Sequence, residues 1–350
     1  MLGENSTAAP PSRFGLSADV PIFIEVSVLS HDRRLSKPAR VALVGALTAI
    51  AAYALITIVV AIAGSGKGGG IPVGRGPVAI GAGEGSIWVP TGDGTVTRIA
   101  EASGRVLGRL RLAGSGFAIG VGERSVWVAD NETRVEGFDT TSGATLGSFT
   151  FTDAYPDALA VDAGSVWIAN SVTNKVTRLE ARSGRLLGTV GVGRDPLHIA
   201  AGDGSVWVAN LGSDDVTRVD SRSGALLATI PLGSVAAAIA VGDGSVWVTN
   251  GVANTVTRID ATTGHVVGRI PVGRTPIAVA VGGGTVWVLN HGDHSLTRIN
   301  SQTGRVFGAR IAAGYSADAI AVGGDSVWVT EQETDSVTRI DARTGKVQNG

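Results

Sequence analysis

The feature of this chain that most constrains its fold is a tryptophan that recurs at a nearly fixed interval. Each tryptophan stands in the pattern [ST]-[VI]-W-[VI], and successive ones are 39 to 41 residues apart. They are Trp88, Trp127, Trp167, Trp207, Trp247, Trp287 and Trp328. A period of this length indicates a repeat architecture, in which one unit cannot bury its own apolar faces and must stack on its neighbours.

Each repeat unit contains four short runs of β-forming residues. In the unit around Trp247 these are IAV, SVWV, VTRID and a run that ends in IPVG at residues 270–273. The turn sequences G-D-G and D-x-x-[ST]-G separate the runs, and no helical period lies between them. Four strands repeated seven times predict an all-β, seven-bladed β-propeller over residues 71–350. In such a fold, both sides of a blade are covered, so each tryptophan is expected to pack between blades.

A charged pair recurs in the third run, V-T-R-[IVL]-[DEN]. The arginines are Arg98, Arg178, Arg218, Arg258, Arg298 and Arg339, and Gly137 takes this position in the remaining unit. The acids two residues later include Asp139, Glu180, Asp220, Asp260 and Asp341. We expect this ladder to make charge-assisted hydrogen bonds within and between blades.

The repeat also predicts how the ring closes. The last unit ends in DARTGKVQNG, without the IPVG run, whereas residues 71–74 read IPVG at the start of the repeat region. We therefore expect residues 71–73 to supply the outermost strand of the seventh blade, beside Val337–Ile340. This closure would remove an open sheet edge.

One long apolar run precedes the repeats. Residues 41–63 carry no charge, and a helix of about 20 apolar residues spans a bilayer core. Basic residues gather just before it, which predicts a cytoplasmic tail at 1–40, a single-pass transmembrane helix at 41–63, a glycine-rich linker at 64–70 and a propeller outside the cell membrane. The face with the D-x-x-[ST]-G turns is expected to look toward the membrane. A cleaved signal peptide is the alternative, because an A-x-A-like site occurs at residues 61–63.

Composition excludes several kinds of function. The formal net charge of −1 argues against nucleic acid as a partner, and the absence of cysteine excludes disulfides and thiol chemistry. The sequence has no G-x-S-x-G pattern leading from a strand into a helix, and GSGKGGG at 64–70 lacks the spacing of a phosphate-binding loop.

Candidate site residues are those that depart from the repeat near the entrance to the first strand of each unit. At one entrance position the series is alanine in six units and His198 in the seventh, and one residue earlier Asp157 and Asp318 stand out. Arg75 and Arg274 share this rim, and His291 and His294 lie in a polar loop. The candidates for ligand binding on the channel face are Tyr155, Asp157, Arg194, His198, Tyr315, Asp318 and Glu331. The alternative is that these side chains only satisfy loops and neighbouring strands; no catalytic residue is assigned.

The units resemble the YVTN-type β-propeller repeat. V-W-V-[AT]-N stands where that family has Y-V-T-N, and TVTRID and IPVG match too, over residues 71 to about 346. The units are also similar to those of the streptogramin B lyase (virginiamycin B lyase) family, and SVWVTE at 326–331 is the best match. The lyase resemblance implies a catalytic histidine and a glutamate-held Mg²⁺, for which only His198 and Glu331 could serve. No unit has a Glu-x-His pairing.

Two functions are therefore expected. The first is a non-catalytic, membrane-anchored module outside the cytoplasm, without cofactor, that binds a protein, a cell-wall component or a small ligand. The alternative is a lyase-like enzyme with a metal-assisted site over the central channel.

Overall fold

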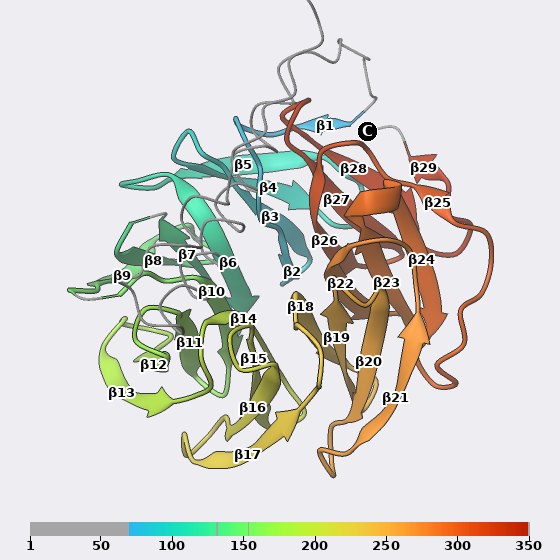
Figure 1. Cartoon of the computed structure of the whole chain (residues 1–350). Helices are drawn as coiled ribbons and strands as arrows, with labels where there is room; N and C mark the ends of the chain where they lie inside the picture. The colour runs from blue at the N-terminus through green and yellow to red at the C-terminus, as the bar shows by residue number, and fades with distance from the viewer. Residues whose placement is uncertain (1–69, 131, 153, 349–350) are drawn as a thin grey trace, which may run out of the picture. The chain divides into compact units, whose positions relative to one another are not determined.

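The structure, a computed structural model, describes residues 70–348 except 131 and 153. Seven antiparallel sheets surround a central axis, which confirms the all-β, seven-bladed propeller (Figure 1). In the part of the chain that is described, the one helical element is the short 3-10 turn η2 (His291–Asp293), and no helix has the length and apolarity needed to cross a bilayer. The predicted tail at 1–40, the helix at 41–63 and linker residues 64–69 lie outside the described residues.

Six blades follow the chain from the innermost to the outermost strand. Blade 1 has β2 (Gly81–Gly83), β3 (Ser86–Pro90), β4 (Thr95–Ala100) and β5 (Val106–Arg111); blade 2 has β6 (Gly116–Gly122), β7 (Ser125–Asp130), β8 (Arg134–Asp139) and β9 (Thr145–Thr150). Blade 3 has β10 (Ala158–Asp162), β11 (Ser165–Asn170), β12 (Lys175–Glu180) and β13 (Leu186–Gly191); blade 4 has β14 (Pro196–Gly202), β15 (Ser205–Asn210), β16 (Asp215–Asp220) and β17 (Leu226–Pro231). Blade 5 has β18 (Ala238–Gly242), β19 (Ser245–Asn250), β20 (Thr255–Asp260) and β21 (Val266–Pro271); blade 6 has β22 (Pro276–Gly282), β23 (Thr285–Asn290), β24 (Ser295–Asn300) and β25 (Ile311–Ala312).

Blade 7 uses both ends of the propeller sequence. Its order is β26 (Ala317–Gly323), β27 (Ser326–Glu331), β28 (Ser336–Asp341) and β1 (Ile71–Pro72), and β29 (Val347–Gln348) also pairs with β28. β1 lies opposite residues 336–337, and β29 lies opposite residues 339–340. The expected closure is confirmed, but the outermost strand is built from two half-strands.

The split strand corrects the expected path of the chain. β29 occupies the end of β28 nearest the D-x-x-[ST]-G turn, so residue 70 reaches the blade midway along its outer edge. The expectation that the face with the D-x-x-[ST]-G turns looks toward the membrane assumed that the linker joins the propeller at that face. The structure removes this basis for the expectation.

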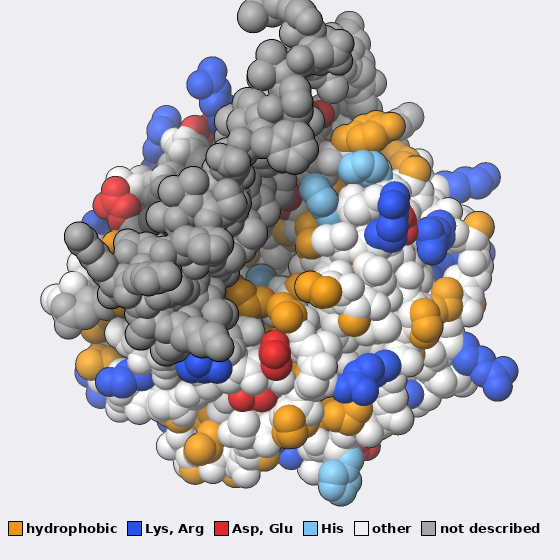
Figure 2. Space-filling model, in the orientation of Figure 1, with side chains coloured by type: hydrophobic (Ala, Val, Ile, Leu, Met, Phe, Trp, Pro, Cys, Tyr) orange, Lys and Arg blue, Asp and Glu red, His pale blue; other side chains and the backbone are white. Residues whose placement is uncertain are grey.

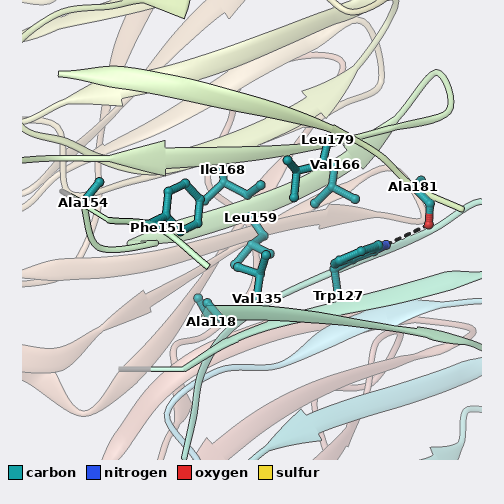
Figure 3. Packing of buried hydrophobic residues seen from close by; sticks show 11 residues of the cluster. Ala118, Trp127, Val135, Phe151, Ala154, Leu159, Val166, Ile168, Leu179 and Ala181 are labelled. Carbon is teal, nitrogen blue, oxygen red and sulfur yellow. Dashed lines mark hydrogen bonds between the residues drawn. The ribbon is translucent and has the colours of Figure 1, made fainter. Parts of the chain in front are cut away.

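The tryptophans fill the spaces between blades, as predicted. All seven are at most 1% exposed, and each stands on the second strand of its blade, where valines and isoleucines flank it. Figure 3 shows one such layer, in which Trp127 of blade 2 packs with Leu159, Val166 and Leu179 of blade 3. The hydrophobic core is therefore a ring of interblade layers rather than a single centre.

The arginine of V-T-R holds its tryptophan in place. In six blades the guanidinium carbon lies 4.8–5.8 Å from the centre of the tryptophan ring on the adjacent strand. In five of these blades Nε donates to the serine that begins the tryptophan strand, at 2.8–3.0 Å. Arg258 Nη1 also donates to the carbonyl oxygen of Gln302 in the next blade, at 2.9 Å. The expected hydrogen bonds within and between blades are confirmed for the arginines.

The recurring acids make the expected charge-assisted hydrogen bonds mainly within their own blades, and Asp139 also pairs with Arg182 of the next blade at 3.8 Å. Asp220 Oδ1 accepts hydrogen bonds from the backbone N–H and hydroxyl of Ser223, both at 2.7 Å, and Asp260 does the same with Thr263. These hydrogen bonds lower the pKa of both aspartates. The acids therefore cap their own D-x-x-[ST]-G turns, because the turn brings free N–H groups within reach of a short carboxylate.

Candidate ligand site at the mouth of the channel

A cavity of about 300 Å³ opens where the first strands of all seven blades begin. Each blade contributes two or three consecutive residues, which are mostly alanine, valine, leucine and isoleucine. In Figure 2, hydrophobic side chains gather near the centre of the view, over the inner strands. The cavity is therefore a largely apolar depression on the axis of the ring.

Irregular pairing at the start of the first strand helps to build this wall. The register between the first and second strands shifts in four blades: between Gly116 and Ala118, Pro196 and His198, Pro276 and Ala278, and Ala317 and Ile320. A bulge of this kind changes which side chains point to a given face. In blades 1, 3 and 5 the pairing is regular, and consecutive residues line the cavity there as well.

Three ionisable side chains line the cavity, and all three are sequence candidates: Asp157, His198 and Asp318. Burial raises the pKa of Asp318 to about 6 and lowers the pKa of His198 to about 4. His198 lines the cavity, but protein atoms surround most of its side chain. Its charged form is therefore poorly hydrated. Burial also raises the pKa of Asp157, against the hydrogen bond that its Oδ2 accepts from Ser171 N at 2.6 Å.

Glu331 lies behind the cavity wall at the end of β27. Its side chain is buried, and Oε1 accepts a hydrogen bond from Gly314 N at 3.0 Å. Burial, together with the negative charges of Asp318 and Glu333, raises the pKa of Glu331 to about 7. Near pH 7, Asp318 is therefore mostly ionised, and its charge helps to keep a proton on Glu331.

The other three sequence candidates do not line the cavity. Tyr155 and Tyr315 are 55% and 77% exposed, and Arg194 is also exposed, with its backbone N–H bound to Ser213 Oγ. Tyr315 lies against His294, with the ring centres 4.6 Å apart. Of the seven predicted residues, three therefore line the cavity, Glu331 is buried behind it, and the other three are exposed outside it.

Sequence reasoning missed two parts of the site region. Phe117 lines the cavity, but an apolar residue in an apolar series gives no signal. A second cavity of about 480 Å³ lies beside blade 6, where Asp293 pairs with Arg274 at 2.7 Å and with Arg310 at 3.0 Å. Arg310 lies outside the repeated motifs, so the spacing of the repeats could not predict its ion pair with Asp293.

The residues described by the structure do not assemble a metal site. No group of three or more His, Asp or Glu side chains among them could hold an ion. In particular, His198 lines the cavity and Glu331 does not. The described residues therefore do not provide a fitting donor set for the Mg²⁺ that the lyase resemblance implies.

The fold and the site define a closed seven-bladed propeller with a small apolar cavity at the channel mouth. A family model described as outer membrane protein assembly factor BamB matches residues 212–349. No curated protein matches the chain.

Several solved structures share the fold. Virginiamycin B lyase from Staphylococcus aureus has a TM-score of 0.65 at 18% identity, over 75% of this chain and 94% of that one. The computationally designed Ika8 protein gives 0.60 at 14%, over 77% and 98%, and BamB from Moraxella catarrhalis gives 0.56 at 12%, over 79% and 88%. Identities this low establish the propeller fold and not an activity. The specific YVTN-type resemblance stays a prediction.

Proposed function

We propose that this protein is a non-catalytic binding module, anchored by residues 41–63 with the propeller outside the membrane, and that the channel-mouth cavity is its binding site. The observation that carries the proposal is the makeup of the cavity. All seven blades supply an apolar wall, and only Asp157, His198 and Asp318 are ionisable. Small-molecule sites combine apolar walls with few polar groups in this way, and about 300 Å³ is at the lower end of their usual volumes.

The arrangement of the ionisable groups supports binding over catalysis. His198 makes no hydrogen bond to a carboxylate among the described residues, and a pKa of about 4 makes it a weak base at neutral pH. An effective general base needs a pKa near the working pH and a partner that orients it. The family match and the BamB fold likeness favour a partner that is itself a protein, which would present a side chain to the cavity.

A lyase-like activity is the second candidate, and the carboxyl pair favours it. Glu331, with a pKa of about 7, lies close enough to Asp318 to feel its charge, and such a group can exchange protons at neutral pH. The fold likeness to virginiamycin B lyase is consistent with this role. On this reading, His198 would contact the substrate, and Glu331, which does not line the cavity, would act through the neighbouring Asp318.

A cavity-filling variant tests the binding function. Full-length protein in detergent is screened by thermal shift against a set of small molecules and peptides. The variant Ala278→Trp, whose side chain would fill the cavity, is screened in parallel. Ala102→Trp, at an exposed D-x-x-[ST]-G-type turn, is the matched control. We expect ligands whose shift is lost in Ala278→Trp and kept in Ala102→Trp. If no ligand distinguishes the two variants, the cavity is not the binding site.

The same material tests the enzyme. Wild type, His198→Ala and Glu331→Gln are incubated with a cyclic depsipeptide and Mg²⁺, and ring opening is followed by mass spectrometry. Opening by wild type that both variants abolish would establish the lyase. The binding function predicts no ring opening in any of the three.

A further inference from the structure

We propose that the channel-mouth cavity recognises an alkylammonium group, that is, a cationic amine on a short aliphatic body. The group would belong to a free amine or to a lysine side chain of a partner protein. The inference rests on the proposed binding function and names the ligand class for that site.

The charges that line the cavity are all of one sign. Asp157 and Asp318 face it, and no arginine or lysine is among the lining residues. Neither aspartate takes part in an ion pair with any residue that the structure describes. His198 is neutral at pH 7, so it does not repel a cation. A ligand anion would meet two carboxylates and no counter-charge.

The nearby cations are held away from the cavity. Arg194 is exposed on the rim, and Arg274 is bound to Asp293 beside blade 6. Glu331 adds a further carboxyl behind Asp318. The protein therefore gathers acids around the mouth and leaves their charge without compensation.

The hydrogen bonding of the two aspartates leaves acceptors free for a ligand. Asp157 accepts hydrogen bonds from the backbone and the side chain of Ser171, and Asp318 accepts none from any residue that the structure describes. Burial disfavours their ionised forms because hydration is lost and no protein cation replaces it. An ammonium group would supply three N–H donors and the missing charge.

The cavity wall fits an aliphatic body. Ala79, Ala118, Ala238, Ala278 and Ala319 present only methyl groups, so the space is apolar and unobstructed. Phe117 lies at the mouth in blade 2, next to the blade that carries Asp157. A cation over an aromatic face gains further attraction. A bare metal ion fits less well, since no three metal-binding side chains converge in the part of the chain that the structure describes.

Binding is tested on the full chain in detergent by ligand-observed NMR titration at pH 8. The probes are n-butylammonium, n-butanol and butyrate, with a short peptide that carries one central lysine and the same peptide acetylated at that lysine. We expect butylammonium to bind at least about tenfold more tightly than butanol, because one charge-assisted contact exceeds about 1.4 kcal/mol. We expect Asp318→Asn to remove this preference and Asp325→Asn, at an exposed hairpin turn, to keep it.

The outcomes separate the two proposals. Equal binding of butylammonium and butanol would overturn the ammonium inference and leave the binding function standing. If no probe binds, and the screen with Ala278→Trp is also negative, the binding function itself fails. Tighter binding of the free amine or of the lysine peptide identifies the natural source of the group.

The pH dependence provides an independent readout. The titratable groups that line the cavity are Asp157, His198 and Asp318. Glu331 and Glu333 in blade 7, and Asp195 beside Asp157, act on them or on one another through their charges. Protonation of Asp318 should lower the affinity for butylammonium about fivefold between pH 8 and pH 5, as expected if binding lowers its pKa of about 6 by about one unit. Asp318→Asn should flatten this dependence. A flat profile in the wild type would overturn the inference.

Discussion

At the scale of the residue, a guanidinium group contacts the tryptophan of its own blade in six of the seven blades, and in three of them it also donates to a carbonyl oxygen of the next blade. Arg258 lies over Trp247, donates to Ser245 Oγ and donates to the carbonyl oxygen of Gln302 in the next blade. Blade 2 lacks this group. There, Trp127 Nε1 donates to the carbonyl oxygen of Ala181 in blade 3 (Figure 3). Gly137 lies against the indole of Trp127.

Gly137 should therefore resist change although other units carry arginine there. A Cβ atom at this position would lie 2.4 Å from Trp127 Cε2, so Gly137→Ala forces the indole to move. We expect a loss of about 1–3 kcal/mol in the free energy of unfolding, measured by urea denaturation. Gly268→Ala is the control, because no atom lies within 4 Å of its Cβ, and a change within about 0.5 kcal/mol is expected. Equal effects would show that Trp127 has room to shift.

Glu331 should make stability depend on pH. Its folded pKa of about 7 exceeds the unfolded value of 4.5, so the folded protein keeps a proton that the unfolded chain loses. The wild type therefore loses stability as the pH rises from about 4.5 to 7. Glu331→Gln keeps the acceptor for Gly314 N and cannot ionise. Its midpoint of thermal unfolding should exceed that of the wild type at pH 8 and match it at pH 4. The control Asp325→Asn should not show a difference from the wild type that grows with pH.

At the scale of the element, the outermost strand of blade 7 is made of two unequal pieces. Ile71 of β1 is 6% exposed and packs with Ile87 and Ile99 of blade 1 as well as with Trp328 and Val337 of blade 7. Val347 of β29 is 53% exposed. The free energy of closure should therefore come mainly from β1.

A pair of charge substitutions tests this asymmetry. Ile71→Asp places an unpaired carboxylate in an apolar layer between two blades, and we expect a loss of at least about 3 kcal/mol in unfolding free energy. Val347→Asp remains in water and should cost less than about 1 kcal/mol. Urea denaturation measures both. Similar losses for the two variants would mean that β29 closes the ring as strongly as β1.

The sequence predicts the elements well where the repeat is regular. Seven indoles at one spacing require seven equivalent layers, and the displaced IPVG run identifies the closing strand. The half-strand β29 was not foreseen, because Val347 and Gln348 lack the IPVG pattern. The partners of Asp220 were not foreseen, because a turn capped by its own acid and a ladder of paired charges have the same sequence signature.

The site could be predicted only in part. The odd residues at the entrance, Asp157, His198 and Asp318, do meet in one cavity, because the ring places equivalent positions around one axis. Tyr155 and Tyr315 stand two or three residues earlier and point outward. The pairing at the start of the first strand is shifted in the blades of His198 and Asp318 and regular in the blade of Asp157, and no sequence pattern marks this difference.

At the scale of the whole molecule, each blade packs against two neighbours and the two half-strands complete the ring. Pro72 lies directly opposite Ser336, and Val73 N donates to Asp335 O, so 72 and 336 form the non-hydrogen-bonded pair, with Cα atoms about 4.5 Å apart. The chain contains no cysteine, so an introduced pair can bond only with itself.

Locking this pair should stabilise the whole ring. Pro72→Cys with Ser336→Cys closes a loop of about 260 residues, which the chain-entropy relation values at about 5 kcal/mol. Pro271→Cys with Thr255→Cys has the same register in blade 5 but closes only about 16 residues, worth about 3 kcal/mol. We expect the larger rise in unfolding temperature for the first pair, lost on reduction. Failure of residues 72 and 336 to crosslink would contradict the closure.

Because residues 71 and 348 pair with the same strand, β28, the ring has no built-in first blade. The order in which the blades are synthesised therefore does not determine the final fold. A gene permuted so that a short peptide bridges 348 to 71, with new ends placed in the turn at residues 102–103, would specify the same circle read from another starting point.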